Sequence, residues 1–142
     1  MTDPGLVARK LAVLRDHVGR IERRYPASAD ALRADEDRLD AICMSVLVAV
    51  QESVDVAFHL ASDAGWGSAS TYAEGFATLA DRGVITADLA RELGGAARLR
   101  NRIAHGYASV DVDALFRDLP GGVAAFRAFA ERVAAYLITP HS

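Results

Sequence analysis

The sequence predicts an all-α protein, an up-and-down bundle of five or six helices. Hydrophobic residues make up 51% of the chain and are mostly alanine, leucine and valine, a composition that favours helices over strands. Many of them recur every three or four residues, as in amphipathic helices. No segment alternates polar and apolar residues for long enough to predict a strand. The 142 residues suffice for one substantial core, so residues 1–142 are predicted to form a single helical domain.

The first predicted helix covers about residues 5–24. Its apolar side chains form one stripe, made of Val7, Leu11, Leu14, Val18 and Ile21. Tyr25 and Pro26 end this helix, because proline disfavours a helical conformation in the residue that precedes it. Residues 28–35 are then expected to form a polar loop or a short helical turn.

The second predicted helix begins at residue 35 or 37 and runs to residue 62. It is apolar on most sides between residues 41 and 60, as expected for a central helix that others surround. Thr71 and Glu74 have the spacing of a capping box, which predicts the start of a third helix. Gly83 is expected to end that helix.

The last part of the chain is predicted to form a fourth helix and one or two more. Thr86 is a suitable N-cap for the fourth helix. Asp111 or Asp113 could start a fifth, and residues 120–122, Pro-Gly-Gly, are expected to break it. A final helix is predicted over residues 123–137.

The composition limits the location of the protein. The longest uncharged run, residues 41–51, is far shorter than the ~20 apolar residues that a membrane helix needs. The first residues lack the basic and apolar regions of a signal peptide. Cys43 is the only cysteine, which excludes an intrachain disulfide and predicts a small core residue. We therefore expect a cytoplasmic protein with no membrane partner.

Charge and motifs exclude several functional classes. The formal net charge of −3 is unlike that of a general nucleic-acid coat, so any RNA must bind at a local patch. The sequence has no Gly-x-Gly-x-x-Gly, no P-loop and no Gly-x-Ser-x-Gly. Dinucleotide-binding, kinase and serine-hydrolase functions therefore have no support.

The densest cluster of reactive groups lies in residues 98–107, which contain three arginines, a histidine and a tyrosine. On a helix at 100° per residue, Arg100 lies within about 60° of a set of mostly apolar residues, namely Leu93, Ala96, Ala97, Ile103, Ala104 and Tyr107. An arginine on such a face is costly unless a partner or ligand meets it. His105 lies about 140° away and can converge with Arg100 only if the helix ends or bends near Ala104. Gly106 is a plausible stop.

This segment resembles the Arg-x4-His-x-Tyr signature of the HepT family, the toxin members of the HEPN superfamily of small helical ribonucleases. The matching residues are Arg100, His105 and Tyr107, with the polar Asn101 directly after the arginine. Residues 49–60, 71–76 and 79–85 also resemble the second helix, the third helix and the following turn of the family. The resemblance covers roughly residues 5–138.

The resemblance implies a metal-independent endoribonuclease toxin of a type VII-like toxin–antitoxin system. Arg100 and His105 would be its catalytic residues. Arg100 would stabilise charge on the phosphorane, and His105 would move a proton, while the 2′-hydroxyl of the RNA would be the nucleophile. The products would be a 2′,3′-cyclic phosphate and a 5′-hydroxyl. No cofactor or metal is expected in the toxin itself.

The resemblance also implies partners. HEPN proteins form homodimers in which two signature helices meet in one cleft. The expected antitoxin is a minimal nucleotidyltransferase, which would use ATP to transfer AMP to Tyr107 and so silence the toxin. The RNA substrate would be the third partner.

Several residues keep two interpretations. Arg100 could form a structural ion pair, and His105 could be a helix C-cap. Asn101 could support the substrate or occupy an ordinary exposed position. Arg98 and Arg102 are predicted to be solvated, and His17 and His141 to lie at the surface.

Gln51, Asp55 and His59 share one helical face. They are predicted to form a polar seam in the bundle or at a dimer interface. Alternatively, Asp55 pairs with Arg100 in a supporting role. A metal site is not predicted, because two ligands without a third are poor evidence.

Two other functions stay open at this point. The chain could be a non-catalytic subunit that presents a substrate to a nucleotidyltransferase, or a structural helical adaptor without a ligand. Cleavage of RNA by the purified protein in EDTA separates the first of these from the ribonuclease.

Overall fold

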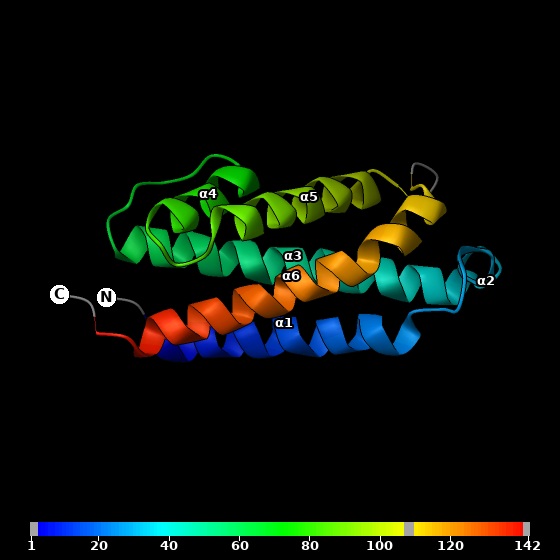
Figure 1. Cartoon of the computed structure of the whole chain (residues 1–142), viewed down its shortest axis with the longest axis horizontal. Helices are drawn as coiled ribbons and strands as arrows, with labels where there is room; N and C mark the ends of the chain where they lie inside the picture. Colours follow the sequence, from blue (N-terminus) through cyan, green and yellow to red (C-terminus); the bar gives the residue numbers. More distant parts are fainter. Residues whose placement is uncertain (1–2, 107–109, 141–142) are drawn as a thin grey trace.

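The computed structural model describes residues 3–106 and 110–140. Within these residues the chain forms six helices and no strand, which confirms the all-α prediction (Figure 1). The helices are α1 (Pro4–Arg24), α2 (Ala29–Arg33), α3 (Glu36–Asp63), α4 (Tyr72–Asp81), α5 (Ala87–Ala104) and α6 (Val112–Ile138). The central α3 contacts each of the other helices, while α6 packs on both α1 and α5. In Figure 1, α1 lies along one side of α3 and the α4–α5 pair along the opposite side.

Each described helix begins at a side chain that caps it. The oxygen of this residue accepts a hydrogen bond from the backbone N–H three residues later, which satisfies a donor that the helix itself leaves free. Thr71 and Thr86, the caps predicted from the sequence, bind the N–H groups of Glu74 and Leu89. The other caps are Asp3, Ser28, Asp35 and Asp111. Local sequence therefore determines where the helices start.

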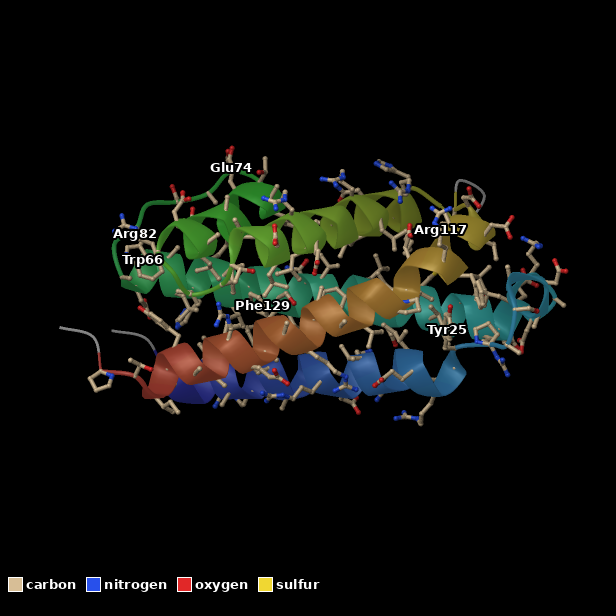
Figure 2. All side chains as sticks on the ribbon, viewed as in Figure 1. Tyr25, Trp66, Glu74, Arg82, Arg117 and Phe129 are labelled. Atoms are coloured by element: carbon tan, nitrogen blue, oxygen red, sulfur yellow. The ribbon has the colours of Figure 1, made fainter. Side chains whose placement is uncertain are left out.

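The core follows the predicted apolar stripes. All five stripe residues of α1 are at most 2% exposed. Phe76 of α4 and Phe129 of α6 (labelled in Figure 2) meet edge to face, with their ring centroids 5.9 Å apart. Cys43 is fully buried, as predicted for a core residue. Among the described helices, only α3 is long and apolar enough to cross a membrane, and more than half of that stretch is buried inside the bundle, as expected for a core helix.

The predicted break at residues 120–122 is wrong, because α6 is continuous from Val112 to Ile138 and contains Pro120. Proline has no N–H, so the carbonyl of Phe116 lacks its usual helical donor. Tyr25 replaces that donor with its hydroxyl, 2.6 Å from the carbonyl oxygen. Tyr25 lies beneath the first turns of α6 (Figure 2), which are inclined to the rest of the helix (Figure 1).

His17, predicted to lie at the surface, is only partly exposed. Its ring is half-buried between α1 and α3, and Nδ1 lies 3.1 Å from the hydroxyl oxygen of Ser45, which is itself buried. The reason is the close packing of α1 on α3, which brings this edge of α1 against a small serine. His141 lies outside the described residues.

Candidate active site

The signature segment occupies the last turns of α5. The helix ends at Ala104, and Gly106 follows with φ of +124°, a conformation that favours glycine, so the predicted stop is confirmed. Asn101 and His105 are exposed, and Arg100 is half-buried. The structure therefore confirms that Arg100 projects from the packed side of the helix. Tyr107 lies outside the described residues.

His105 is the C-cap residue of α5. Its backbone N–H still donates to the carbonyl of Asn101, at 3.2 Å, and its φ of −81° is helical. The imidazole therefore stays about 140° around the axis from Arg100. Among the interactions of the described residues, no hydrogen bond or ion pair joins the two side chains. Ending the helix at Ala104 is thus not enough to bring them together within one chain.

The Arg100 guanidinium lies against α4. Its carbon Cζ is 5.8 Å from the centroid of the Tyr72 ring, within the range of a cation–π contact. Nη1 is 3.4 Å from Oδ1 of Asn101. Nε is buried and has no hydrogen-bond partner among the described residues. A buried N–H donor without a partner is costly. Among the described residues the guanidinium has no ion pair, and Arg100 is only half-buried, so its accessible N–H groups are suited to an acceptor outside the described chain, such as a phosphate oxygen.

The alternative in which Asp55 pairs directly with Arg100 is wrong. Asp55 accepts a hydrogen bond from Nζ of Lys10 at 3.1 Å and another from Nε2 of Gln51 at 2.8 Å. Gln51 in turn lies 3.4 Å from the hydroxyl of Tyr72. Asp55 is therefore linked to Arg100 only through Gln51 and Tyr72. The physical reason is that Lys10, on α1, and Gln51 already occupy the two oxygens of this carboxylate.

The predicted polar seam is confirmed for Gln51 and Asp55 only. Nε2 of His59 lies 3.2 Å from a carboxylate oxygen of Asp63 and 3.4 Å from the backbone N of Asp3. Asp55 and His59 thus have separate partners. No group of three or more His, Cys, Asp or Glu side chains that could hold a metal occurs in residues 3–106 and 110–140.

Lys10, the only lysine of the chain, has a structural role that sequence reasoning missed. Its ammonium group contacts Asp55 and also Glu52, at 3.4 Å. Burial lowers the pKa of Lys10, but the hydrogen bonds and charges of the two carboxylates outweigh it and raise that pKa above its usual value. The cation is therefore held firmly in its charged form. One feature of the sequence could have indicated this role: Lys10 is the single lysine of an arginine-rich chain, and it lies beside the apolar stripe of α1.

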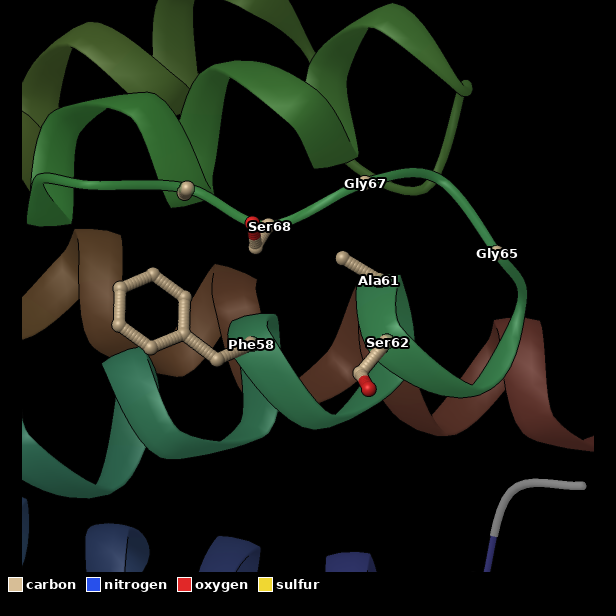
Figure 3. Close-up of a pocket in the computed structure, with 7 residues that line it drawn as sticks. Phe58, Ala61, Ser62, Gly65, Gly67 and Ser68 are labelled. Atoms are coloured by element: carbon tan, nitrogen blue, oxygen red, sulfur yellow. The ribbon is translucent and has the colours of Figure 1, made fainter.

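The described residues form a groove and a cavity near the bundle surface. A groove of about 430 Å³ separates α5 from α6 beside the signature, with Ala96, Leu99 and Val123 in its walls and Arg102 among its charged residues. The charged side chains that line it also include three carboxylates, Glu92, Asp111 and Asp118. A second cavity, of about 420 Å³, lies between the end of α3 and the loop that follows it (Figure 3). None of its lining residues titrates, so it offers no acid–base chemistry.

Comparison with known proteins identifies the family of the chain. Residues 14–133 match the family model of ribonuclease HepT-like proteins. The tRNA nuclease HepT of Aphanizomenon flos-aquae is 23% identical over 138 residues, which cover 96% of this chain and 93% of that protein. The family match spans most of the chain.

The fold also matches solved structures. The tri-AMPylated HEPN toxin of Shewanella oneidensis, in complex with its MNT antitoxin, superposes with a TM-score of 0.85, at 21% identity over 95% of this chain and 99% of that one. The cytosolic protein YutE of Bacillus subtilis superposes with a TM-score of 0.83, at 17% identity over 99% of this chain and 96% of that one. The helical fold and the position of the signature on α5 agree with the family match. The chain therefore belongs to the HepT-like ribonuclease family.

Proposed function

We propose that this protein is a metal-independent endoribonuclease, the toxin of a type VII-like toxin–antitoxin pair. The observation that carries the proposal is the Arg100 guanidinium at the end of α5, whose buried Nε has no acceptor among the described residues. The exposed imidazole of His105 ends the same helix. A phosphodiester would supply both an anionic partner for the accessible N–H groups of the guanidinium and a group on which the imidazole can act.

The proposed reaction needs no protein nucleophile. The 2′-oxygen of the RNA attacks the adjacent phosphorus, and the bond from phosphorus to the 5′-oxygen of the next nucleotide breaks. His105 takes the proton from the 2′-hydroxyl or gives one to the leaving 5′-oxygen. Arg100 stabilises the negative charge of the phosphorane, and Asn101 supports the substrate beside it. The products are a 2′,3′-cyclic phosphate and a 5′-hydroxyl.

A homodimer is part of this proposal. Within one chain Arg100 and His105 point in different directions from α5, so a second copy of the helix would be needed to place an imidazole opposite a guanidinium. Two copies would also supply two imidazoles, one as base and one as acid. Light scattering at micromolar concentration should give the mass of a dimer, and a monomer would contradict the shared cleft.

The proposed partner is a minimal nucleotidyltransferase antitoxin that transfers AMP from ATP to Tyr107. The support is the family match and the Shewanella oneidensis HEPN toxin, which is described as tri-AMPylated and bound to an MNT antitoxin. AMP at this position would place a tethered phosphate close to the end of α5 and block the RNA site. After incubation with the partner nucleotidyltransferase and ATP, intact-mass analysis should show AMP added to the wild-type protein, and this addition should be absent in Tyr107→Phe.

The decisive experiment is RNA cleavage by the purified protein in EDTA, with tRNA tested first because the Aphanizomenon flos-aquae relative is a tRNA nuclease. Arg100→Ala and His105→Ala should each abolish cleavage without unfolding the protein. The alternative function, a non-catalytic subunit that presents a substrate to a nucleotidyltransferase, predicts no cleavage by the wild-type protein. We expect the protein to act in the cytoplasm.

A further inference from the structure

Arg100 is half-buried without an ion pair, and its position therefore depends on what it packs against. Among the described residues its guanidinium contacts the ring of Tyr72, at the start of α4, and the amide oxygen of its own neighbour Asn101. No carboxylate is bonded to it among the described residues. Since no ion pair among these residues orients the guanidinium, the cation–π contact with the Tyr72 ring is the main polar interaction that orients it.

The Tyr72 ring is itself held at its hydroxyl end. A carboxylate can only accept hydrogen bonds, so Asp55 must face the Nε2 group of Gln51, at 2.8 Å. The amide oxygen of Gln51 therefore turns toward Tyr72, whose hydroxyl donates to it across 3.4 Å. Lys10 fixes the other oxygen of Asp55 at 3.1 Å. Side chains from α1 and α3 thus fix the orientation of the phenol on α4.

The same ring contacts a second aromatic residue. Phe58 of α3 contacts Tyr72 edge to face, with ring centroids 6.3 Å apart and an interplanar angle of 62°. Phe58 can approach this closely because residue 75 is glycine, where a Cβ atom would lie only 2.5 Å from Cε1 of Phe58. The ring that supports Arg100 is therefore confined by Phe58 as well as at its hydroxyl.

We infer that Tyr72 is a positioning residue for Arg100: its ring face holds the guanidinium in the orientation that presents its accessible N–H groups to the RNA phosphate. Gln51, Asp55 and Lys10 act one step further away, by fixing the ring. This inference rests on the proposed function, because it assigns Arg100 the phosphate-binding role. It adds three helices, α1, α3 and α4, to a site otherwise built from α5.

A matched control is present at the other end of the bundle. Arg82 lies over the ring of Trp66, with Cζ 5.6 Å from the ring centroid, and this second cation–π pair is far from the end of α5 (Figure 2). Trp66→Leu therefore removes the same kind of contact, from a half-buried ring, without touching the signature. Tyr72→Leu removes the contact to Arg100, and Tyr72→Phe keeps the ring but releases it from Gln51.

The first measurement does not depend on activity. In ¹⁵N-labelled protein, the Hε proton of Arg100, assigned by its loss in Arg100→Lys, should be shifted upfield by the Tyr72 ring. We expect this shift to be lost in Tyr72→Leu, reduced in Tyr72→Phe and unchanged in Trp66→Leu. An unshifted wild-type Hε, or a shift that persists in Tyr72→Leu, would overturn the inference.

The second measurement is the kinetics of RNA cleavage. A misplaced guanidinium should lower kcat by on the order of tenfold to hundredfold in Tyr72→Leu. KM should change little, and Tyr72→Phe should lie between this variant and the wild type. Wild-type kcat in folded Tyr72→Leu would overturn the inference, and so would an equal loss in Trp66→Leu. If Tyr72→Leu does not fold, Tyr72→Phe decides by the same two readouts.

The two proposals fail in different ways. If the wild-type protein does not cleave RNA, the proposed ribonuclease function is wrong, whereas the Hε shift still decides whether Tyr72 orients Arg100. If the wild-type protein cleaves RNA and Tyr72→Leu cleaves equally well, only the positioning role is wrong.

Discussion

The hydroxyl of Tyr25 donates a hydrogen bond to the backbone carbonyl of Phe116, and the two rings stack with centroids 4.9 Å apart and an interplanar angle of 7°. The carbonyl is the one that Pro120 leaves without a donor inside α6. A side chain at the end of α1 thus completes the backbone bonding of a helix that lies 91 residues away in sequence.

Tyr25→Phe should lower the free energy of unfolding by about 1 kcal/mol, because it removes the donor but keeps the stacked ring. Chemical denaturation measures this loss. The loss should be smaller when Pro120→Ala is also present, since a backbone N–H at position 120 can then serve the same carbonyl. Equal losses in both backgrounds would show that the two groups do not share this carbonyl.

Arg100→Lys should lower kcat for RNA cleavage by on the order of a hundredfold, because a single ammonium cannot replace the planar fork of a guanidinium at a phosphorane. Single-turnover cleavage of tRNA would measure it. Arg98→Lys, at an exposed position two residues earlier on α5, is the matched control and should cleave at the wild-type rate. Wild-type cleavage by Arg100→Lys would contradict the proposed role of the guanidinium.

Protonation of His17 should destabilise the fold. Burial lowers the pKa of His17 below its usual value of about 6.5, and the nearby charge of Arg20 lowers it further, against the opposite effects of Asp16 and Glu52. Between the folded and unfolded pKa values the unfolded chain binds more protons, so the free energy of unfolding falls as the pH falls from about 7.

His17→Gln keeps a polar side chain beside Ser45 but cannot titrate. The difference in free energy of unfolding between wild type and His17→Gln, followed by urea denaturation from pH 7.5 to pH 5, isolates the histidine from the carboxylates. As the pH falls, the wild type should lose stability relative to His17→Gln. A difference that stays constant with pH would contradict this prediction.

Cys43 should react with thiol reagents only through opening of the fold. The side chain is fully buried, and burial, with a smaller effect of the charge of Asp40, raises the pKa of the thiol to about 11. The thiolate is the reactive form, so at pH 8 both exposure and ionisation oppose labelling. The labelling rate should rise with urea in parallel with unfolding. Fast labelling of the native protein would show that this part of α3 opens locally.

Local rules predicted the elements whose determinants are close in sequence. The caps Thr71 and Thr86 bind N–H groups three residues away, and the glycine after α5 needs only its own backbone freedom. The buried stripe of α1 and the half-buried position of Arg100 follow from helical periodicity alone. These features depend on contacts within one or two turns, which the order of residues determines directly.

Contacts between distant residues decided the rest. Pro120 predicts a break by every local rule, and α6 continues because Tyr25 satisfies the orphaned carbonyl from another helix. Asp55 lies on the same helix as Gln51, as predicted. Its ion pair with Lys10, however, joins residues 45 apart in sequence, and this pair keeps Asp55 from pairing with Arg100. Hydrogen-bond donors compete for an acceptor by distance in space. The sequence therefore determined the helices and the residues of the signature, while only the tertiary packing decided that Arg100 would meet the Tyr72 ring rather than a carboxylate.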